Sequence, residues 1–348
     1  MFCAGWLHMP GIIRNFATAF GHIMGDAPFC VNLKFIITNM LHHLINKSAI
    51  FRCLLMLLAV AMLSATASAY DFSSGVLCYN INSDGKSVSV VSHLSASGAV
   101  TIPATVKNGS KTYSVTAIGE SAFSECTGLT KITFPTSLTA IEAFAFSECT
   151  GLTEVTIPAT LKSLGHHSFY ACTGMAKVVW NAPNFGPVDN NAASPCHFLN
   201  CTNIKSFVFG NNVTSIPNYL CYGLTGLTTV TIPATVTAIG RDAFQSCYNL
   251  TTVNWNAVNC QDTPNGFSPF GSCQKLKTIT FASNIKRIPT SLCRHLTALT
   301  SVTIPATVTE IGTYAFDDTG LTSVTIPAAV TTVGNYAFQN CANLTKVI

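Results

Sequence analysis

Cysteine is the residue type best placed to do chemistry in this chain, with 15 copies in 348 residues. Twelve follow residue 69, and seven of these recur at one position of a repeated stretch. No two form a C-x-x-C pair, so the spacing does not indicate zinc. Thiols stacked in successive coils would have parallel Cβ vectors, which favours a column of buried thiols over disulfides. The seven are Cys126, Cys149, Cys172, Cys201, Cys247, Cys273 and Cys341.

The other chemistry-bearing residues give weaker signals. Cys196 and Cys201 are either a local disulfide or two unpaired thiols, and the spacing favours neither. His166 and His167 are adjacent, so their side chains point in different directions and a surface pair is expected rather than a metal site. Asp317-Asp318 reads as a solvated turn rather than a calcium site.

Motifs of the common enzyme classes are missing from the sequence. It contains no H-E-x-x-H, no nucleophile elbow and no phosphate-binding glycine loop. After residue 69 there are fourteen Lys and Arg against thirteen Asp and Glu, so no basic excess points to nucleic acid. We therefore expect a protein that is not an enzyme, with no catalytic, cofactor-binding or metal-binding residues, no cofactor and no nucleic-acid partner.

A repeat must position these residues. The stretch "LTTVTIPATVTAIGRDAFQSCYN" covers Leu227–Asn249, and its opening residue recurs at steps of 22 to 29 residues. Sustained self-similarity at such a period is typical of a solenoid. The opening residues are Leu129, Leu152, Met175, Ile204, Leu227, Leu250, Leu276, Leu299, Leu321 and Leu344.

One coil has a simple internal pattern. Val230-Thr231-Ile232 alternates inward and outward, which predicts a short strand that Pro233 ends. Val236 and Ile239 are a second inward pair, and the segment around Phe244 predicts a tight or single-turn helical segment. These apolar positions are buried only when coils stack on one another.

The repeat form "LTxVTIPATVTxIGxxAFxxC" resembles the BspA-type leucine-rich repeats of bacterial surface proteins. The entry segment "YDFSSGVLCYNINSDGKSVSVV" resembles the start of the mature chain in such proteins from Bacteroides-like bacteria. The resemblance implies a leucine-rich-repeat solenoid with short parallel β-strands on one face and turns and short helical segments on the other. It also implies adhesion to host matrix proteins or other microbes, and it supplies no catalytic residues.

Four segments are expected along the chain. Residues 1–39 suggest an early start codon, and 40–69 a secretory signal peptide, with a transmembrane anchor as the alternative. Residues 70–112 should form an N-terminal β cap, and 113–348 a solenoid of about ten 23-residue coils. The chain stops inside a strand at Ile348, so we expect the solenoid to be C-terminally incomplete, with an anchor or further coils beyond it.

Two features are specific to this chain. Cys221 and Cys293 stand where other coils have Phe, and the Cys position of those coils holds Leu224 and Leu296, as conservation of core volume requires. Two longer insertions, at 183–198 and 258–270, are expected to form loops on which specificity would lie.

The outward strand positions predict a ligand face. Short hydroxyl side chains dominate it, which suits an extracellular protein or glycan, although Thr is also an ordinary exposed strand residue. A third hypothesis is that the regular array of threonines binds ice, and the serines that interrupt this array argue against it. We expect a secreted or cell-surface adhesion protein of a Gram-negative bacterium, or alternatively a stalk presenting another domain. The face comprises Lys131, Thr133, Glu154, Thr156, Lys177, Thr229, Thr231, Asn254, Thr280, Thr303 and Thr325.

Overall fold

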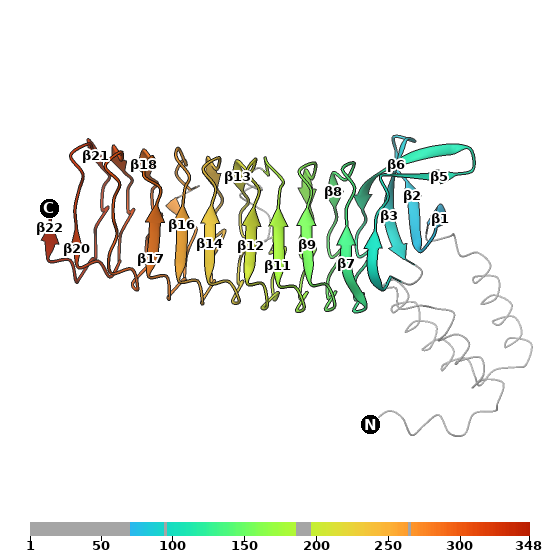
Figure 1. Ribbon diagram of the computed structural model, residues 1–348, viewed down its shortest axis with the longest axis horizontal. Coiled ribbons are helices and arrows are strands. Elements are labelled where there is room, and N and C mark those ends of the chain that lie inside the picture. Colours follow the sequence, from blue (N-terminus) through green and yellow to red (C-terminus); the bar gives the residue numbers. More distant parts are fainter. Residues whose placement is uncertain (1–69, 94–95, 186–195, 264–265) are drawn as a thin grey trace, which may run out of the picture. The chain divides into compact units, whose positions relative to one another are not determined.

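The computed structural model describes residues 70–93, 96–185, 196–263 and 266–348. The early start and the signal peptide predicted within residues 1–69 lie outside the described residues. Within the described ranges, no helix is long and apolar enough to cross a membrane. The described chain from residue 70 onwards is a parallel β-solenoid of about eleven turns, with one coil following the next (Figure 1).

Antiparallel strands open the solenoid. β1 and β2 pair with each other, β2 pairs with β3, and β5 forms a hairpin with β6. β6 also pairs in parallel with β3 and β8, so it joins this N-terminal layer to the coils. The strands are β1 (Phe72–Ser74), β2 (Leu77–Ile81), β3 (Ser87–His93), β4 (Gly98–Thr101), β5 (Thr105–Asn108) and β6 (Lys111–Ile118).

Most coils contribute one strand to a row of parallel strands along one side of the solenoid (Figure 1). Neighbouring strands pair in a register that matches one repeat to the next, for example Val230 with Val253. The row contains β7 (Leu129–Thr133), β9 (Glu154–Ile157), β11 (Lys177–Trp180), β12 (Ser206–Phe209), β14 (Thr229–Ile232), β16 (Thr252–Trp255), β17 (Thr278–Phe281), β20 (Ser323–Val324) and β22 (Lys346–Val347).

The return arm of each coil makes a second row of two-residue strands. In the quoted coil this strand, β15, begins two residues after the inward Val236, and Val236 and Ile239 are buried in the same core as the first row. The second row contains β8 (Ala140–Ile141), β10 (Ser163–Leu164), β13 (Ser215–Ile216), β15 (Ala238–Ile239), β18 (Arg287–Ile288), β19 (Glu310–Ile311) and β21 (Thr332–Val333).

The expected short helical segments are turns instead, and the described residues form no helix. In most coils the residues two before and two after the buried residue of the turn have positive φ, as Asp242 (53°) and Ser246 (61°) do on either side of Phe244. A left-handed residue on each side prevents a helical run. The turns instead bond to the next coil: Phe244 N–H donates to the Pro269 carbonyl at 2.8 Å, and Ser246 N–H to the Gly271 carbonyl at 2.9 Å.

The core is a stack of identical side-chain positions. Phe123, Phe146, Phe169 and Phe198 form a column in which ring centroids are 5.1 Å apart. Offset-stacked aromatic pairs at this separation are favourable beyond the area they bury. At the N-terminal end the ring of His93 stacks on Phe123, with centroids 5.6 Å apart.

The first row of strands is interrupted at three places. β7 and β9 share a single registered pair, β12 and β14 belong to different sheets, and residues 301–304 after β17 form no strand. Each interruption follows a coil with Phe at the last inward strand position, namely Phe134, Phe209 or Phe281. Ile157, Trp180, Ile232 and Trp255 are fully buried at that position, and their strands pair over four residues with the next coil.

Incomplete burial accompanies the interruptions. Phe209 and Phe281 keep 6% and 8% exposure, and Phe134 is half-buried, whereas Trp180 and Ile232 are at 0%. Loss of strand pairing to the next coil therefore coincides with a Phe ring that is not fully buried at this position.

Candidate ligand-binding face

The alternation of the short strands builds the strand face, which we define as the outward positions of the first row. In β14 the inward Val230 and Ile232 are buried, and the outward Thr229 and Thr231 are exposed. Because successive strands pair in register, the outward residues of neighbouring coils lie in rows across the sheet. Thr229, Thr252 and Thr278 occupy one such row.

The structure places most of the predicted ligand residues on this face. Ten of the eleven are exposed and Asn254 is half-buried; one of the ten, Thr303, lies in the coil that forms no strand. The exposed residues on paired strands are brought together only within each sheet, because the interruptions divide the row. The nine besides Asn254 and Thr303 are Lys131, Thr133, Glu154, Thr156, Lys177, Thr229, Thr231, Thr280 and Thr325.

Charge on the strand face is sparse and mostly basic. Lys131 Nζ and Glu154 Oε1 lie 3.7 Å apart as an exposed ion pair, and Lys177 is paired in register with the same Glu154. An exposed pair of this kind contributes little to stability. Asn254 Nδ2 donates to Thr231 Oγ1 at 3.1 Å, so at least one predicted threonine is engaged by its neighbour.

Two hollows open on the strand face at the first two interruptions. The larger, of about 670 Å³, lies between β12 and β14 and extends over the ends of β16 and β17. The smaller, of about 280 Å³, lies between β7 and β9. Both include predicted face residues, Thr229 and Thr231 in the larger and Thr133 and Thr156 in the smaller.

Sequence reasoning missed several residues that line the larger hollow. Lys205 and Asn211 come from the coil that opens at Ile204, and Asn256 and Asn284 from those that open at Leu250 and Leu276; none was among the predicted face residues. A signal for two of them existed: the usual "PAT" at 233–235 is replaced by "GNN" at 210–212 and "ASN" at 282–284. Departures from the repeat therefore mark this surface better than the repeat itself.

Many threonines away from the strand face have a structural role. Thr235 Oγ1 donates to the Val213 carbonyl and Thr307 Oγ1 to the Ile285 carbonyl, both at 2.7 Å. Each bond joins a coil to the preceding one and satisfies a carbonyl at the edge of the core. The high Thr content therefore has two causes, and only the strand-face threonines remain candidates for ligand contact.

The predicted cysteine column donates to the backbone of neighbouring coils. Cys149 Sγ donates to the Phe123 carbonyl at 3.0 Å, and Cys172 and Cys201 repeat this contact with Phe146 and Phe169. Bonding to the neighbouring Cys149 and Cys201, together with burial, raises the pKa of the Cys172 thiol well above its usual value. The Cys172 thiol is therefore neutral. Cys247, Cys273 and Cys341 make the same contact, and Cys126 ends the column.

His93 caps this column at its N-terminal end. Its Nδ1 accepts from the Ala96 N–H at 3.0 Å, so the proton lies on Nε2, which is 2.8 Å from Cys126 Sγ. The imidazole therefore donates to the sulfur and is not a base that activates the thiol. Cys201 is a thiol bonded to a backbone carbonyl, which leaves the proposed Cys196–Cys201 disulfide unformed in this structure.

The histidines do not assemble a metal site. His166 is exposed, His167 is half-buried, and their ring planes meet at 85°. His197, which the sequence did not single out, is fully buried and its Nδ1 lies 2.9 Å from the Gly165 carbonyl. Across the described ranges, no group of three His, Cys, Asp or Glu could hold a metal ion. The Asp317-Asp318 pair is bound instead to Arg294 and His295 by ion pairs of 3.0 Å.

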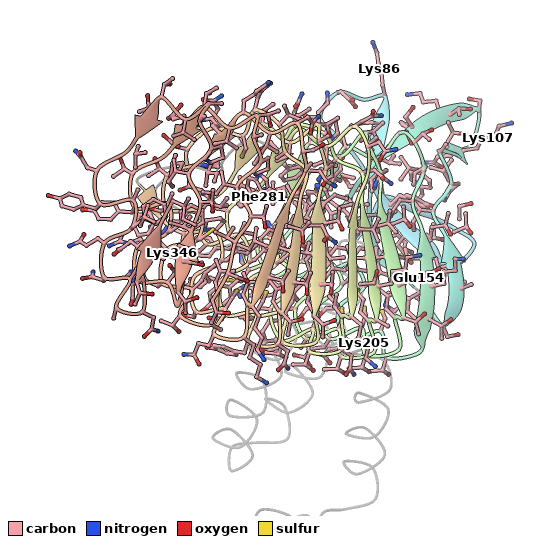
Figure 2. All side chains as sticks on the ribbon, turned by 60° about the vertical axis from the view of Figure 1, so that its left-hand side comes forward. Lys86, Lys107, Glu154, Lys205, Phe281 and Lys346 are labelled. Carbon is pink, nitrogen blue, oxygen red and sulfur yellow. The ribbon has the colours of Figure 1, made fainter. Side chains whose placement is uncertain are left out.

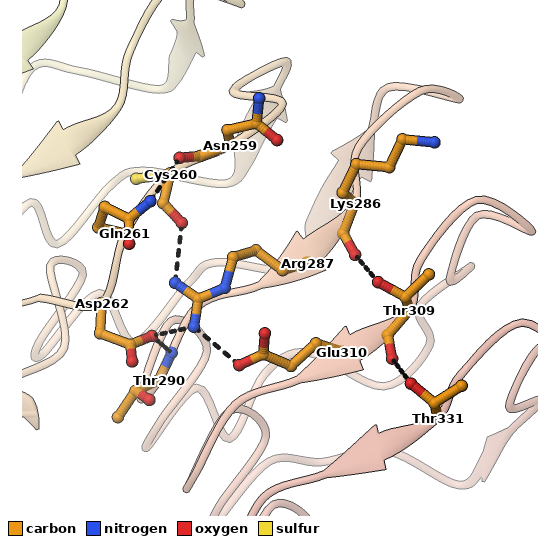
Figure 3. A network of polar contacts seen from close by, with 10 residues as sticks. All are labelled: Asn259, Cys260, Gln261, Asp262, Lys286, Arg287, Thr290, Thr309, Glu310 and Thr331. Atoms are coloured by element: carbon orange, nitrogen blue, oxygen red, sulfur yellow. Dashed lines mark hydrogen bonds and ion pairs between the residues drawn. The ribbon is translucent and has the colours of Figure 1, made fainter.

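Arg287 bonds the second long insertion to the return arm. Its Nη2 is 2.9 Å from both Asp262 Oδ1 and Glu310 Oε1, and Nη1 donates to the Cys260 carbonyl at 3.2 Å (Figure 3). The Thr290 N–H also donates to Asp262 at 2.8 Å. This network fixes one end of the second insertion. In the first insertion, residues 186–195 lie outside the described residues.

A stack of short parallel strands, each opening on a buried Leu and backed by an inward turn, defines a leucine-rich-repeat solenoid, a scaffold typical of protein interaction. The model of the BspA type leucine rich repeat region matches residues 105–197, 191–318 and 265–348, with six copies. These matches cover more than half of the chain, and the chain belongs to this family.

Several solved structures are similar to this chain. A leucine-rich repeat protein from Bacteroides ovatus is 21% identical, with a TM-score of 0.38, over 80% of this chain and 94% of that one. A leucine rich cell surface protein from Faecalibacterium prausnitzii is 22% identical, with a TM-score of 0.33, over 81% and 95%. The T. pallidum leucine rich repeat protein is 18% identical, with a TM-score of 0.41, over 79% and 90%. No curated protein matches the chain.

Proposed function

We propose that this chain is a secreted or cell-surface repeat protein that binds an extracellular protein or glycan through its strand face. The observation that carries the proposal is the composition of that face, where exposed hydroxyls such as Thr229 and Thr231 stand in register with few charges. A rigid, wettable surface of this kind loses little entropy on binding and presents regularly spaced donors and acceptors.

Membership of the BspA-type family supports the extracellular placement, as do the apolar run and small-residue end within 53–69 of the sequence. Burial of the thiol column also suits an oxidising exterior, because the thiols would be shielded there. Protease treatment of intact cells tests this placement, since a surface protein would be digested without lysis.

Binding is tested with a variant that carries Thr229→Glu, Thr231→Glu and Thr303→Glu. Carboxylates at these three exposed positions should abolish capture by immobilised matrix proteins or neighbouring bacteria while the fold is retained by circular dichroism. The matched control is Ser163→Glu, at an exposed position of β10 on the return arm, which should bind as the unmodified chain does. Equal loss in both variants would refute recognition by the strand face, and no binding by the unmodified chain would favour a stalk.

A further inference from the structure

The larger hollow on the strand face has the size and the chemistry of a ligand site. Its volume of about 670 Å³ lies within the range of roughly 300–1,000 Å³ usual for small-ligand pockets. It opens where β12 and β14 fail to pair, so backbone groups of two strand edges also face it. Such unpaired groups require partners, from solvent or from a ligand.

The walls combine amides with an apolar patch. Asn211, Asn256 and Asn284 each present an amide, which carries both donors and acceptors, and Thr229 and Thr231 add hydroxyls. Val208 is 43% exposed on the wall between them. Side chains able both to donate and to accept, set beside an apolar surface, complement a sugar ring, whose hydroxyls do the same and whose C–H face is apolar.

Lys205 gives the hollow one positive charge. It is the single ionisable residue among the lining residues, all of which lie in the described part of the chain, and it stands at the start of β12 at the lower end of the strands (Figure 2). No carboxylate lines the hollow to neutralise it. A ligand with one carboxylate would therefore be favoured over a neutral one.

An extended peptide fits the hollow less well. Pairing with both open edges would require a strand to enter between the two coils. Those coils are joined on either side of the opening, by the Thr235 hydroxyl to the Val213 carbonyl at 2.7 Å and by the contact of the Phe209 and Phe244 rings at 6.2 Å. A ligand must therefore lie on the opening and cannot insert into it.

We propose that this hollow binds an acidic saccharide, with its carboxylate on Lys205 and its hydroxyls on Asn211, Asn256 and Asn284. The proposal rests on the function proposed above, since it assigns a ligand class to one part of the strand face. It involves binding only, with no covalent step.

Titration calorimetry of the full chain with a uronate-containing tetrasaccharide tests the site. The tetrasaccharide should bind, and its carboxyl-reduced neutral counterpart should bind about tenfold more weakly. Lys205→Met should weaken uronate binding about tenfold and leave the neutral sugar unaffected. Asn256→Ala should weaken both sugars.

Two matched controls lie outside the hollow. Lys277→Met removes a lysine at the equivalent place before β17, and Ser163→Ala removes an exposed hydroxyl of β10 on the return arm, and both should bind as the unmodified chain does. Loss of affinity in the controls equal to that in Lys205→Met, or failure of either sugar to bind, overturns the proposal. Displacement of bound sugar by an uncharged peptide would overturn it in favour of a peptide site. If sugars fail while matrix capture still depends on the strand-face threonines, only this saccharide site is refuted.

Discussion

At the residue scale, the column of Phe rings carries much of the stability. Phe169 is fully buried and stacks on Phe146 and Phe198, each at 5.1 Å. Where two coils have Cys221 and Cys293 at this position, Phe209 and Phe281 stand in their strands, and Phe209 contacts Phe244 of the next coil. The volume missing from the column is thus supplied from the strand as well as by Leu224 and Leu296.

Replacing a Phe of the column by Ala should lower the free energy of unfolding most where a ring stacks on both of its faces. Phe169→Ala is expected to lower the free energy of unfolding by about 3–5 kcal/mol, because it removes a buried ring with partners on both sides. Denaturant titration followed by circular dichroism measures the loss. Phe338→Ala, at a half-buried position with one stacked partner, should cost clearly less, and an equal cost would contradict this account of the column.

Burial of His197 should make the solenoid sensitive to acid. Burial lowers the pKa of His197 to about 4, below the roughly 6.5 of an unfolded chain, and its buried Nε2 has no bonding partner among the described residues. The imidazole is neutral when folded, so its contribution to stability is fully present above about pH 6.5 and is lost as the pH falls towards 4. The loss amounts to about 3 kcal/mol at most.

The melting temperature measured from pH 7.5 to 4 tests this dependence. His197→Leu, which copies Leu220 and Leu292 at the equivalent position, should flatten the profile, and His166→Gln at an exposed site should leave it unchanged. An unaltered profile in His197→Leu would assign the acid sensitivity to other groups.

At the element scale, a strand pairs over four residues with the strand of the next coil where its last inward residue is fully buried, as at Trp180 and Ile232. Phe134, Phe209 and Phe281 are not fully buried, and the ladder to the next coil opens after each. The turns behave differently, because each bonds to the next coil through its backbone regardless of side chain, as Cys221 N–H does to the Ala243 carbonyl at 2.7 Å. Stacking on the turn side therefore continues across the gaps in the strand row.

Restoring the repeat in one coil should close an interruption. In Phe209→Ile combined with Cys221→Phe, the ring moves from the strand to the column, so β14 should pair with β12 and amides at 228–231 should exchange more slowly with deuterium. The amides of β16, already paired with β14, are the internal control. Phe209→Ile alone should destabilise the chain, because Cys221 leaves the vacated volume unfilled. Unchanged exchange at 228–231 in the double variant would count against steric opening by Phe209.

At the scale of the whole molecule, contacts reach only from one coil to the next. The hydrogen bonds of the Cys column, the Thr bonds and the strand pairs all join adjacent turns, so the solenoid has no single centre. Gly240 shows how closely coils approach, since a Cβ there would lie 2.3 Å from the Asn218 backbone nitrogen.

Removing one whole coil should therefore preserve the fold. Deletion of residues 227–249 joins two coils whose faces match those they lose, and the product should remain cooperative and resistant to limited proteolysis. Deletion of residues 227–238 removes half a coil and places inward residues outward, so that product should be digested rapidly. Similar digestion of both products would argue against nearest-neighbour stabilisation.

The sequence by itself determined the period, the inward Leu, Val, Ile and Phe positions, the family and the outward alternation of the strands. Each follows from a pattern within one coil, because every coil meets a near copy of itself. The left-handed turns, the contact of His93 with Cys126 and the hollow of Lys205, Asn211, Asn256 and Asn284 were decided by the tertiary structure. These features depend on how unlike residues of different coils pack together, which the pattern within one coil does not determine.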